Sequence, residues 1–290
     1  MMLPRRQLLA AGLGLAALSA GPARAGAAPR LLALDWSIVE TLLVLGQAPL
    51  GVPETGNYGR TVQQPALPPG CVDLGLRVEP NLELIQALRP ELVLINSGQD
   101  GFLGANLRRI ARTETLRIYG TPQNPYAQAA QETRRLAAML GAEAVAERYL
   151  DGVEQRLATL PRAAPDAAPV YLISLLDQRH AMVYGARSIF QRGLDALGLR
   201  NAWQRPTNGW GFAMSGLAGL AAEPRARLLH IGPIPPEIEA ALQGSRLWQG
   251  LPFIREGRFG LLPPLWVFGA VPTAERFSQL LAERAEVLHG

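Results

Sequence analysis

The sequence predicts an α/β protein made of two lobes that a single long helix joins. Three observations predict this fold. Apolar runs alternate with segments of helical periodicity before residue 142, an uninterrupted helical segment fills 142–160, and the alternation resumes after a connector rich in Pro and Ala. The resulting limits are 26–141 for the first lobe, 142–161 for the joining helix and 162–290 for the second lobe.

The first lobe opens with a strand followed by a helix. The run RLLALDW (30–36) is typical of a buried strand, and the next segment, IVETLLVLG, has helical periodicity and stops at Gly46. A short strand in PLGVPE is followed by a helix over 82–89, which Pro90 ends, and by the strand ELVLI (91–95). Two further helical segments complete the lobe, and the alternation indicates a parallel sheet flanked by helices.

The joining helix, AEAVAERYLDGVEQRLATL (142–160), ends at Pro161. It should be roughly 28 Å long at 1.5 Å per residue. The second lobe then offers the strands VYLISLL, RLLHI and RFGLL, separated by helical segments. Because one helix crosses between the lobes and no extended hinge strands do, we expect a stiff molecule.

The first 25 residues have the layout of a cleaved signal peptide. Arg5-Arg6 precede an apolar run, and Ala23-Arg24-Ala25 supplies small residues for a peptidase. The run is short for a membrane span, which needs about 20 strongly apolar residues. RRQLL resembles a twin-arginine signal, although the general export route stays open. We expect a mature chain that starts near Gly26 and lies free in a periplasm, because no Cys follows the run to carry a lipid.

The composition argues against several classes of protein. A hydrophobic content of 48% with 18% charged residues is typical of a globular protein. The net charge of +4 comes from scattered arginines without any lysine, whereas a nucleic-acid groove concentrates its basic residues. Cys71 is the only cysteine, so an internal disulfide is impossible, and the three histidines lie too far apart in sequence for a metal motif.

A hydrolase is one alternative that the sequence raises. Ser174, Asp177 and His180 lie close together in SLLDQRH, but no G-x-S-x-G motif surrounds the serine. We therefore predict that the protein is not an enzyme.

Several segments carry a family resemblance. LLALDWSIVETLLVLGQAPLGVPETGNY, ALPPGCVDLGLRVEPNLELI, LWQGLPFIREGRF and PLWVFGA resemble the FhuD-type ferric-hydroxamate-binding periplasmic proteins, from about Arg30 to the C-terminus. The resemblance implies a class III fold with a helical backbone between the lobes. It also implies a monomer without cofactor or metal ligands, which takes up iron(III)-hydroxamate siderophores and delivers them to the inner-membrane permease of an ABC importer. The alternative is a carrier of the same architecture for haem or a cobalamin.

Arg77 is the first residue that the resemblance places in the cleft. Arginine has up to five N–H donors in a rigid fork, and Arg77 precedes a helix that begins near Asn81, where the helix dipole is positive. The resemblance implies that Arg77 faces the hydroxamate oxygens. The residues alone equally allow an ion pair between Arg77 and Glu79 or Glu83.

Aromatic residues supply the rest of the expected site. The resemblance implies that Trp36, Trp210, Trp266 and Phe268 line the cleft, with Asn208 as a nearby polar contact. Flat rings give a large contact area at small entropic cost. Without the resemblance each tryptophan is more readily expected in the core, where we place Trp203 and Trp248.

The sequence departs from the family pattern at two places. Gln99 stands where the family has a tyrosine, and Gly59-Arg60-Thr61 replaces a tryptophan that follows NY. Gln99 can still donate hydrogen bonds to the ligand and accept them, and the two missing rings should leave a wider and more polar pocket. Arg60 would suit a siderophore with free carboxylates.

The family docks on its permease through one acidic residue on each lobe. Glu83 is the candidate on the first lobe, with Glu79 as the competing choice. Glu223 is the candidate on the second lobe, where the segment MSGLAGLAAE lacks an acid at the usual place. The alternative is that both glutamates belong to solvated surfaces.

Overall fold

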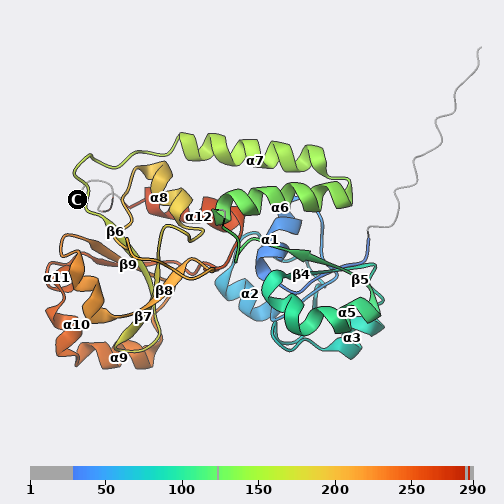
Figure 1. The fold of residues 1–290 in the computed structure, drawn as a ribbon, viewed down its shortest axis with the longest axis horizontal. Helices are drawn as coiled ribbons and strands as arrows, with labels where there is room; N and C mark the ends of the chain where they lie inside the picture. The colour runs from blue at the N-terminus through green and yellow to red at the C-terminus, as the bar shows by residue number, and fades with distance from the viewer. Residues whose placement is uncertain (1–28, 123, 285–286, 288–290) are drawn as a thin grey trace, which may run out of the picture.

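The computed structural model describes residues 29–122, 124–284 and 287, and these form two α/β lobes side by side (Figure 1). Each lobe is built on a five-stranded sheet. The predicted signal peptide over 1–25 and the expected start of the mature chain at Gly26 lie outside the described residues.

The first sheet has the strand order β3-β2-β1-β4-β5, and all of its paired strands are parallel. Its strands are β1 (Leu31–Ala33), β2 (Gly51–Val52), β3 (Val72–Asp73), β4 (Leu92–Asn96) and β5 (Arg112–Leu116). Its helices are α1 (Trp36–Val44), α2 (Thr55–Thr61), α3 (Leu82–Ala87), α4 (Ser97–Gln99) and α5 (Ala105–Ile110), with a π-helical turn at Asp100–Gly104.

Strand β1 shows why an unbroken apolar run forms the centre of this sheet. Successive side chains of a strand point to opposite faces. Leu31 and Ala33 therefore pack with α1 on one face, while Leu32 and Leu34 pack with residues of α3 and α5 on the other. A strand covered on both faces needs apolar residues at every position.

The second sheet has the order β10-β9-β6-β7-β8 and is mixed, because β7 pairs antiparallel with both β6 and β8. Its strands are β6 (Val170–Leu175), β7 (His180–Tyr184), β8 (Phe212–Gly216), β9 (Arg227–Ile231) and β10 (Phe259–Leu262). Its helices are α8 (Gln191–Leu197), α9 (Pro236–Gln243), α10 (Arg246–Gly250), α11 (Pro252–Arg255) and α12 (Val271–Ala282), with a 3-10 turn at Leu217–Ala222.

The sequence analysis missed the β6–β7 hairpin, and the residues that suggested a hydrolase belong to it. The Asp177 carboxylate accepts backbone N–H groups of Arg179 (2.6 Å) and His180 (2.7 Å), which closes the turn. The Ser174 hydroxyl lies 2.9 Å from the Tyr184 hydroxyl on the neighbouring strand. These three residues therefore have roles in the hairpin, and His180 is bonded to Asp177 rather than to Ser174.

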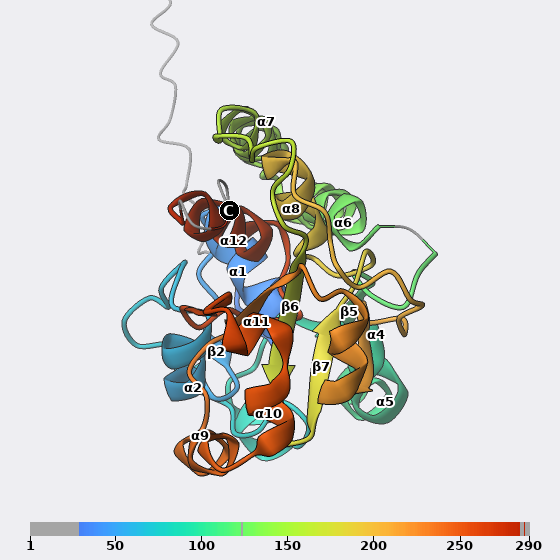
Figure 2. The ribbon, with the colours of Figure 1, turned by 90° about the vertical axis from the view of Figure 1, so that its left-hand side faces the viewer.

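Two long antiparallel helices cover the same side of both lobes, α6 (Pro125–Leu140) and α7 (Glu143–Ala158) (Figures 1 and 2). They turn at Gly141, whose φ of +66° favours glycine. Tyr126 and Leu157 pack in the second lobe, whereas Leu136 and Ala146 pack in the first. The helix predicted over 142–160 is thus present as α7. Helix α6, which the sequence analysis assigned to the first lobe, spans the lobes beside it.

Helix α12 joins the lobes a second time. Glu40 of α1 is fully buried, and its carboxyl group accepts hydrogen bonds from the Ala270 N–H and from the Thr273 hydroxyl (2.8 Å) at the start of α12. Further along α12, Arg276 donates to the carbonyl oxygen of Val62 (2.6 Å). The C-terminal helix therefore bonds directly to the first lobe.

We predict that Glu40 makes the stability of the protein fall as the pH rises. Burial raises the pKa of Glu40 from 4.5 to about 8, although its hydrogen bonds to Ala270 and Thr273 oppose the rise. Between these two values the folded chain keeps a proton that the unfolded chain has released. The free energy of unfolding should then decrease by up to about 1.4 kcal/mol per pH unit. Melting temperatures measured from pH 5 to pH 8 test this.

In the Glu40→Gln variant the free energy of unfolding should fall much less as the pH rises, because glutamine does not titrate. Glu91→Gln removes an exposed carboxylate and serves as the matched control, which should keep the parental pH dependence. An unchanged pH dependence in Glu40→Gln would contradict the assignment.

Candidate functional site

A cavity of about 480 Å³ lies between the lobes. Its first-lobe residues follow the carboxyl ends of parallel strands: Asp35 follows β1, Glu54 follows β2 and Arg77 follows β3. Open parallel sheets bind ligands at this edge, where the loops diverge. The second lobe contributes aromatic rings from the segment that leads into β8 and from the β10–α12 connection. The lining residues are Asp35, Glu54, Arg77, Val78, Asn96, Gly98, Gln99, Phe102, Trp210, Phe212, Trp266 and Phe268.

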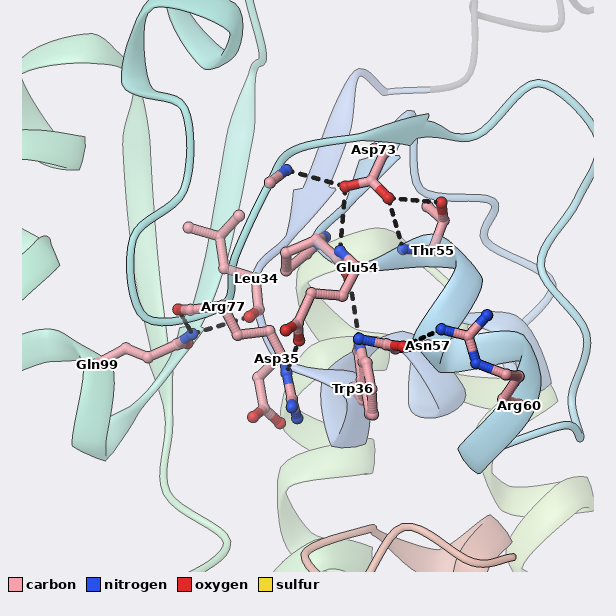
Figure 3. A network of polar contacts seen from close by, with 12 residues as sticks. Leu34, Asp35, Trp36, Glu54, Thr55, Asn57, Arg60, Asp73, Arg77 and Gln99 are labelled. Atoms are coloured by element: carbon pink, nitrogen blue, oxygen red, sulfur yellow. Dashed lines mark hydrogen bonds and ion pairs between the residues drawn. The ribbon is translucent and has the colours of Figure 1, made fainter.

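Arg77 lies between two indole rings in this cavity. Its guanidinium carbon is 3.6 Å from the ring centroid of Trp36 and 4.3 Å from that of Trp266. Its Nε donates to the Glu54 carboxylate (Figure 3). Within the described residues, no hydrogen bond occupies its two terminal nitrogens, so these remain available to a ligand. The ion pairs with Glu79 or Glu83 that the sequence also allowed are not formed.

Glu54 is a site residue that the sequence analysis missed. Its φ of +54° lies in the left-handed region, which is uncommon outside glycine. Its backbone N–H donates to the Gly75 carbonyl (2.9 Å) and to the Asp73 carboxylate (3.1 Å), so the ends of β2 and β3 are tied together (Figure 3). This backbone geometry directs the Glu54 side chain toward Arg77. The available signal was its position at the end of the segment PLGVPE, just after the short strand predicted there.

The charged carboxylate of Asp73 fixes the corner of the site where β2 and β3 end. Its carboxylate accepts hydrogen bonds from the Thr55 hydroxyl (2.8 Å), the Thr55 N–H (2.9 Å) and the Gly75 N–H (2.9 Å). Partial burial alone would raise the pKa of Asp73, but these hydrogen bonds outweigh it and lower the pKa below its usual value. The start of α2 is therefore fixed by a charged side chain.

Gln99 lines the cavity, but the protein itself uses its amide. Its Nε2 donates to the carbonyl oxygens of Leu34 (2.8 Å) and Arg77 (3.0 Å), and its Oε1 accepts the Asn96 N–H (3.1 Å). The side chain is only 5% exposed. The structure thus places Gln99 as a support for the Arg77 backbone, where the sequence analysis expected a polar contact for the ligand.

Asp35 is a second lining carboxylate that the sequence analysis did not select. It caps α1 by accepting the Ser37 N–H (2.9 Å), and it accepts the side-chain amide of Asn96 (2.7 Å). These bonds join the carboxyl ends of β1 and β4. The charged groups that line the cavity are therefore two carboxylates and one guanidinium.

Three of the four predicted aromatic residues line the cavity. The ring of Phe268 lies 5.3 Å from that of Trp210 and 5.5 Å from that of Trp266, and Trp210 stacks on Tyr119 at 5.4 Å. Trp36 is different, because it is 2% exposed and lies behind Arg77, with its Nε1 donating to the Pro53 carbonyl (3.0 Å). The sequence analysis missed the aromatic lining residues Phe102 and Phe212. Trp203 and Trp248 are buried in the second lobe, as predicted.

Asn208 shapes the loop that carries Trp210. Its side-chain oxygen accepts the N–H groups of Trp210 (2.9 Å) and Phe212 (3.3 Å), and it does not line the cavity. Gly211 has a φ of +83°, and a Cβ at this position would lie 2.2 Å from the Arg187 carbonyl oxygen. The loop conformation thus depends on glycine and on the Asn208 side chain.

The residues predicted to dock on a permease lie away from the cavity. Glu83 is exposed in the first turn of α3. The Glu223 carboxylate is half-buried and accepts a hydrogen bond from Arg200 (3.1 Å). Arg60, which was expected in the pocket as a partner for free carboxylates of the siderophore, lines an adjoining hollow instead and donates to the Asn57 side chain (Figure 3).

The described residues contain neither a cluster suited to a metal ion nor a helix suited to a membrane. No group of three or more His, Cys, Asp or Glu side chains among them could hold a metal ion. None of the helices in that part of the chain has the length and apolar character needed to cross a membrane.

Known proteins share this architecture. The family model described as periplasmic binding protein matches residues 31–265. The iron(3+)-hydroxamate-binding protein FhuD of Escherichia coli K12 is 37% identical over 254 residues, which are 87% of this chain and 85% of that protein. The crystal structure of FhuD from Vibrio cholerae with Fe3+-Desferal bound superimposes with a TM-score of 0.82 at 30% identity, and the match covers 90% of this chain and 99% of that one.

A more distant structure shares the fold alone. The petrobactin-binding protein YclQ of Bacillus subtilis has a TM-score of 0.68 at 14% identity, over 88% of this chain and 90% of its own. These matches confirm the predicted two-lobed α/β fold and the predicted resemblance. The chain belongs to the periplasmic binding protein family, in the group that contains FhuD.

Proposed function

We propose that this protein binds iron(III)-hydroxamate siderophores in the cavity between its lobes, as the periplasmic solute-binding component of an ABC importer. The observation that carries the proposal is Arg77, which is held between two indole rings, while no hydrogen bond from the described residues occupies its terminal N–H groups. Hydroxamate oxygens already hold the iron, so a carrier needs donors for those oxygens rather than metal ligands. Arginine stays charged at any physiological pH and offers its donors in a fixed plane.

The aromatic lining suits the organic shell of such a complex. Trp210, Trp266, Phe212 and Phe268 present flat apolar surfaces, and binding sites of this kind combine such surfaces with a few well-placed polar groups. A haem carrier of this architecture would be expected to offer an axial His or Tyr. The lining residues include neither, which favours the hydroxamate ligand over the haem alternative.

Delivery to the permease completes the proposal. We infer a monomer without a cofactor, whose signal peptide is cleaved near Gly26 on export. The intact mass of the protein recovered from the periplasm tests the cleavage site. Glu83 docks the first lobe, since it is exposed on α3. Glu223 is the weaker candidate on the second lobe, because Arg200 already binds its carboxylate.

Arg77→Ala should weaken the binding of ferric hydroxamates by roughly ten- to hundredfold, because a charge-assisted hydrogen bond contributes about 1.5–3 kcal/mol. Arg77→Lys should lose less affinity, since lysine keeps the positive charge but not the planar set of N–H donors. Titration by tryptophan fluorescence at fixed salt measures both. Unchanged affinity of a well-folded Arg77→Ala for every ferric hydroxamate would sink the proposed function.

Gln99→Leu should weaken the binding of the same ligands by a smaller factor than Arg77→Ala does. Leucine keeps the apolar bulk but removes the bonds to the Leu34 and Arg77 carbonyls, so the Arg77 backbone is no longer fixed. The loss should nearly vanish when Gln99→Leu is made in an Arg77→Ala background, since the two substitutions act on one contact. Additive losses would instead mean that Gln99 contacts the ligand by itself.

Glu83→Ala should reduce iron uptake in cells while leaving siderophore affinity unchanged. The carboxylate lies outside the cavity, so only the encounter with the permease should suffer. Growth on a ferric hydroxamate as the only iron source, compared between Glu83→Ala and Glu79→Ala, measures the effect. Equal growth of both variants and the parent would remove Glu83 from the docking surface.

A further inference from the structure

We infer that the cavity selects among ferric hydroxamates by charge, favouring complexes that carry a free protonated amine over those that carry free carboxylates, and that Glu54 is the residue that sets this preference. The inference rests on the proposed function, and it names the class of siderophore within it. Three singly charged hydroxamates cancel the triple charge of iron(III). The net charge of a trihydroxamate complex therefore comes from the groups at the ends of the siderophore.

The first support is the charge of the lining itself. Asp35 and Glu54 contribute two carboxylates against the single guanidinium of Arg77, which leaves one net negative charge among the lining residues. Arg77 already donates its Nε to Glu54, so its charge is compensated before a ligand enters. The side chains of this pair are only 24% and 16% exposed, and charges buried to this degree are screened weakly by salt.

The second support is the geometry that holds Glu54 in place. Its backbone N–H is bonded to both Asp73 and Gly75, and Asp73 is fixed in turn by Thr55. The Glu54 carboxylate is therefore a preorganised negative group at the carboxyl edge of the sheet. One of its oxygens accepts from Arg77, and no hydrogen bond from the described residues occupies the other.

The aromatic rings act in the same direction. Ring faces are negative and attract ammonium groups, at a gain of about 0.5–2 kcal/mol according to desolvation. Trp210, Phe212 and Phe268 line the cavity, and no arginine among the described residues stacks on them. One face of Trp210 packs on Tyr119, so the faces turned to the cavity are the ones a ligand ammonium can occupy. A carboxylate would find the same faces unfavourable.

Arg60 does not reverse this preference. It lines an adjoining hollow that shares Glu54 with the main cavity, and there it faces a second carboxylate, Asp73. Its guanidinium donates to Asn57. The structure thus argues against the carboxylate-bearing siderophore that the sequence analysis associated with Arg60.

A matched ligand series tests the inference. Ferric Desferal carries one free primary amine, its N-acetyl form is neutral, and its N-succinyl form ends in a carboxylate, while the iron-binding part is the same in all three. The expected order of affinity is amine, then acetyl, then succinyl, with roughly tenfold between the first and the last. Equal dissociation constants for the three complexes would overturn the charge preference, whereas failure of all three to bind would overturn the proposed function instead.

Glu54→Gln then assigns the preference to its residue. In this variant the affinities of the three complexes should differ by about threefold or less, mainly because the succinyl complex binds more tightly than it does to the parent. Glu79→Gln removes an exposed carboxylate near Arg77 in the sequence and should keep the parental range. If Glu54→Gln weakens all three complexes by the same factor, Glu54 only orients Arg77 and the inference fails. Melting temperatures of both variants check that the fold is intact.

Discussion

The site depends on one ionic contact, in which Arg77, held between the rings of Trp36 and Trp266, donates to the Glu54 carboxylate. Each of the four residues comes from a different connection of the chain, and three of these follow neighbouring parallel strands of the first sheet. A half-buried guanidinium needs a carboxylate partner and flat surfaces to offset its desolvation. Through these contacts Arg77 joins the residues that follow β1, β2 and β3 to Trp266 of the second lobe.

The second lobe completes this environment through its aromatic residues. Trp266 supplies one of the two faces on Arg77, and Phe268 joins Trp266 to Trp210 through edge-to-face contacts. Trp210 also packs over Gly98 of the first lobe, where a Cβ would approach its ring to 3.1 Å. The cavity wall is thus a continuous layer of rings that both lobes share, and its shape depends on the lobes keeping their relative position.

The sequence predicted the parts of the fold that apolar patterning controls. The runs at β1, β4, β6 and β9 are buried along nearly their whole length and were recognisable as strands. Strand β5 was missed because RTETL is polar and lies at the sheet edge, and β8 was missed because FAMSG is partly exposed and rich in small residues. For such strands the partner strand, rather than local composition, decides the structure.

The same division holds for the site. The family resemblance placed Arg77, Trp210, Trp266 and Phe268, and the structure brings all four to the cavity. Glu54 could not be paired with Arg77 from the sequence, because 23 residues separate them and only the pairing of β2 with β3 brings them together. The contacts that Gln99 makes within the protein could not be predicted for a similar reason, since its partners Leu34 and Arg77 lie 65 and 22 residues away.

The bond between Glu40 and the start of α12 also bears on the order in which the chain can fold. Its two hydrogen bonds span 230 and 233 residues, so α1 of the first lobe cannot make these contacts before α12 has been synthesised. Contacts this far apart in sequence form slowly, because the loop entropy must be overcome before they contribute. Until then the α1 surface that α12 covers is exposed, and a growing chain in this state is open to aggregation or to a chaperone. The first lobe is therefore first in sequence but is completed only after residues 270–273 have been synthesised.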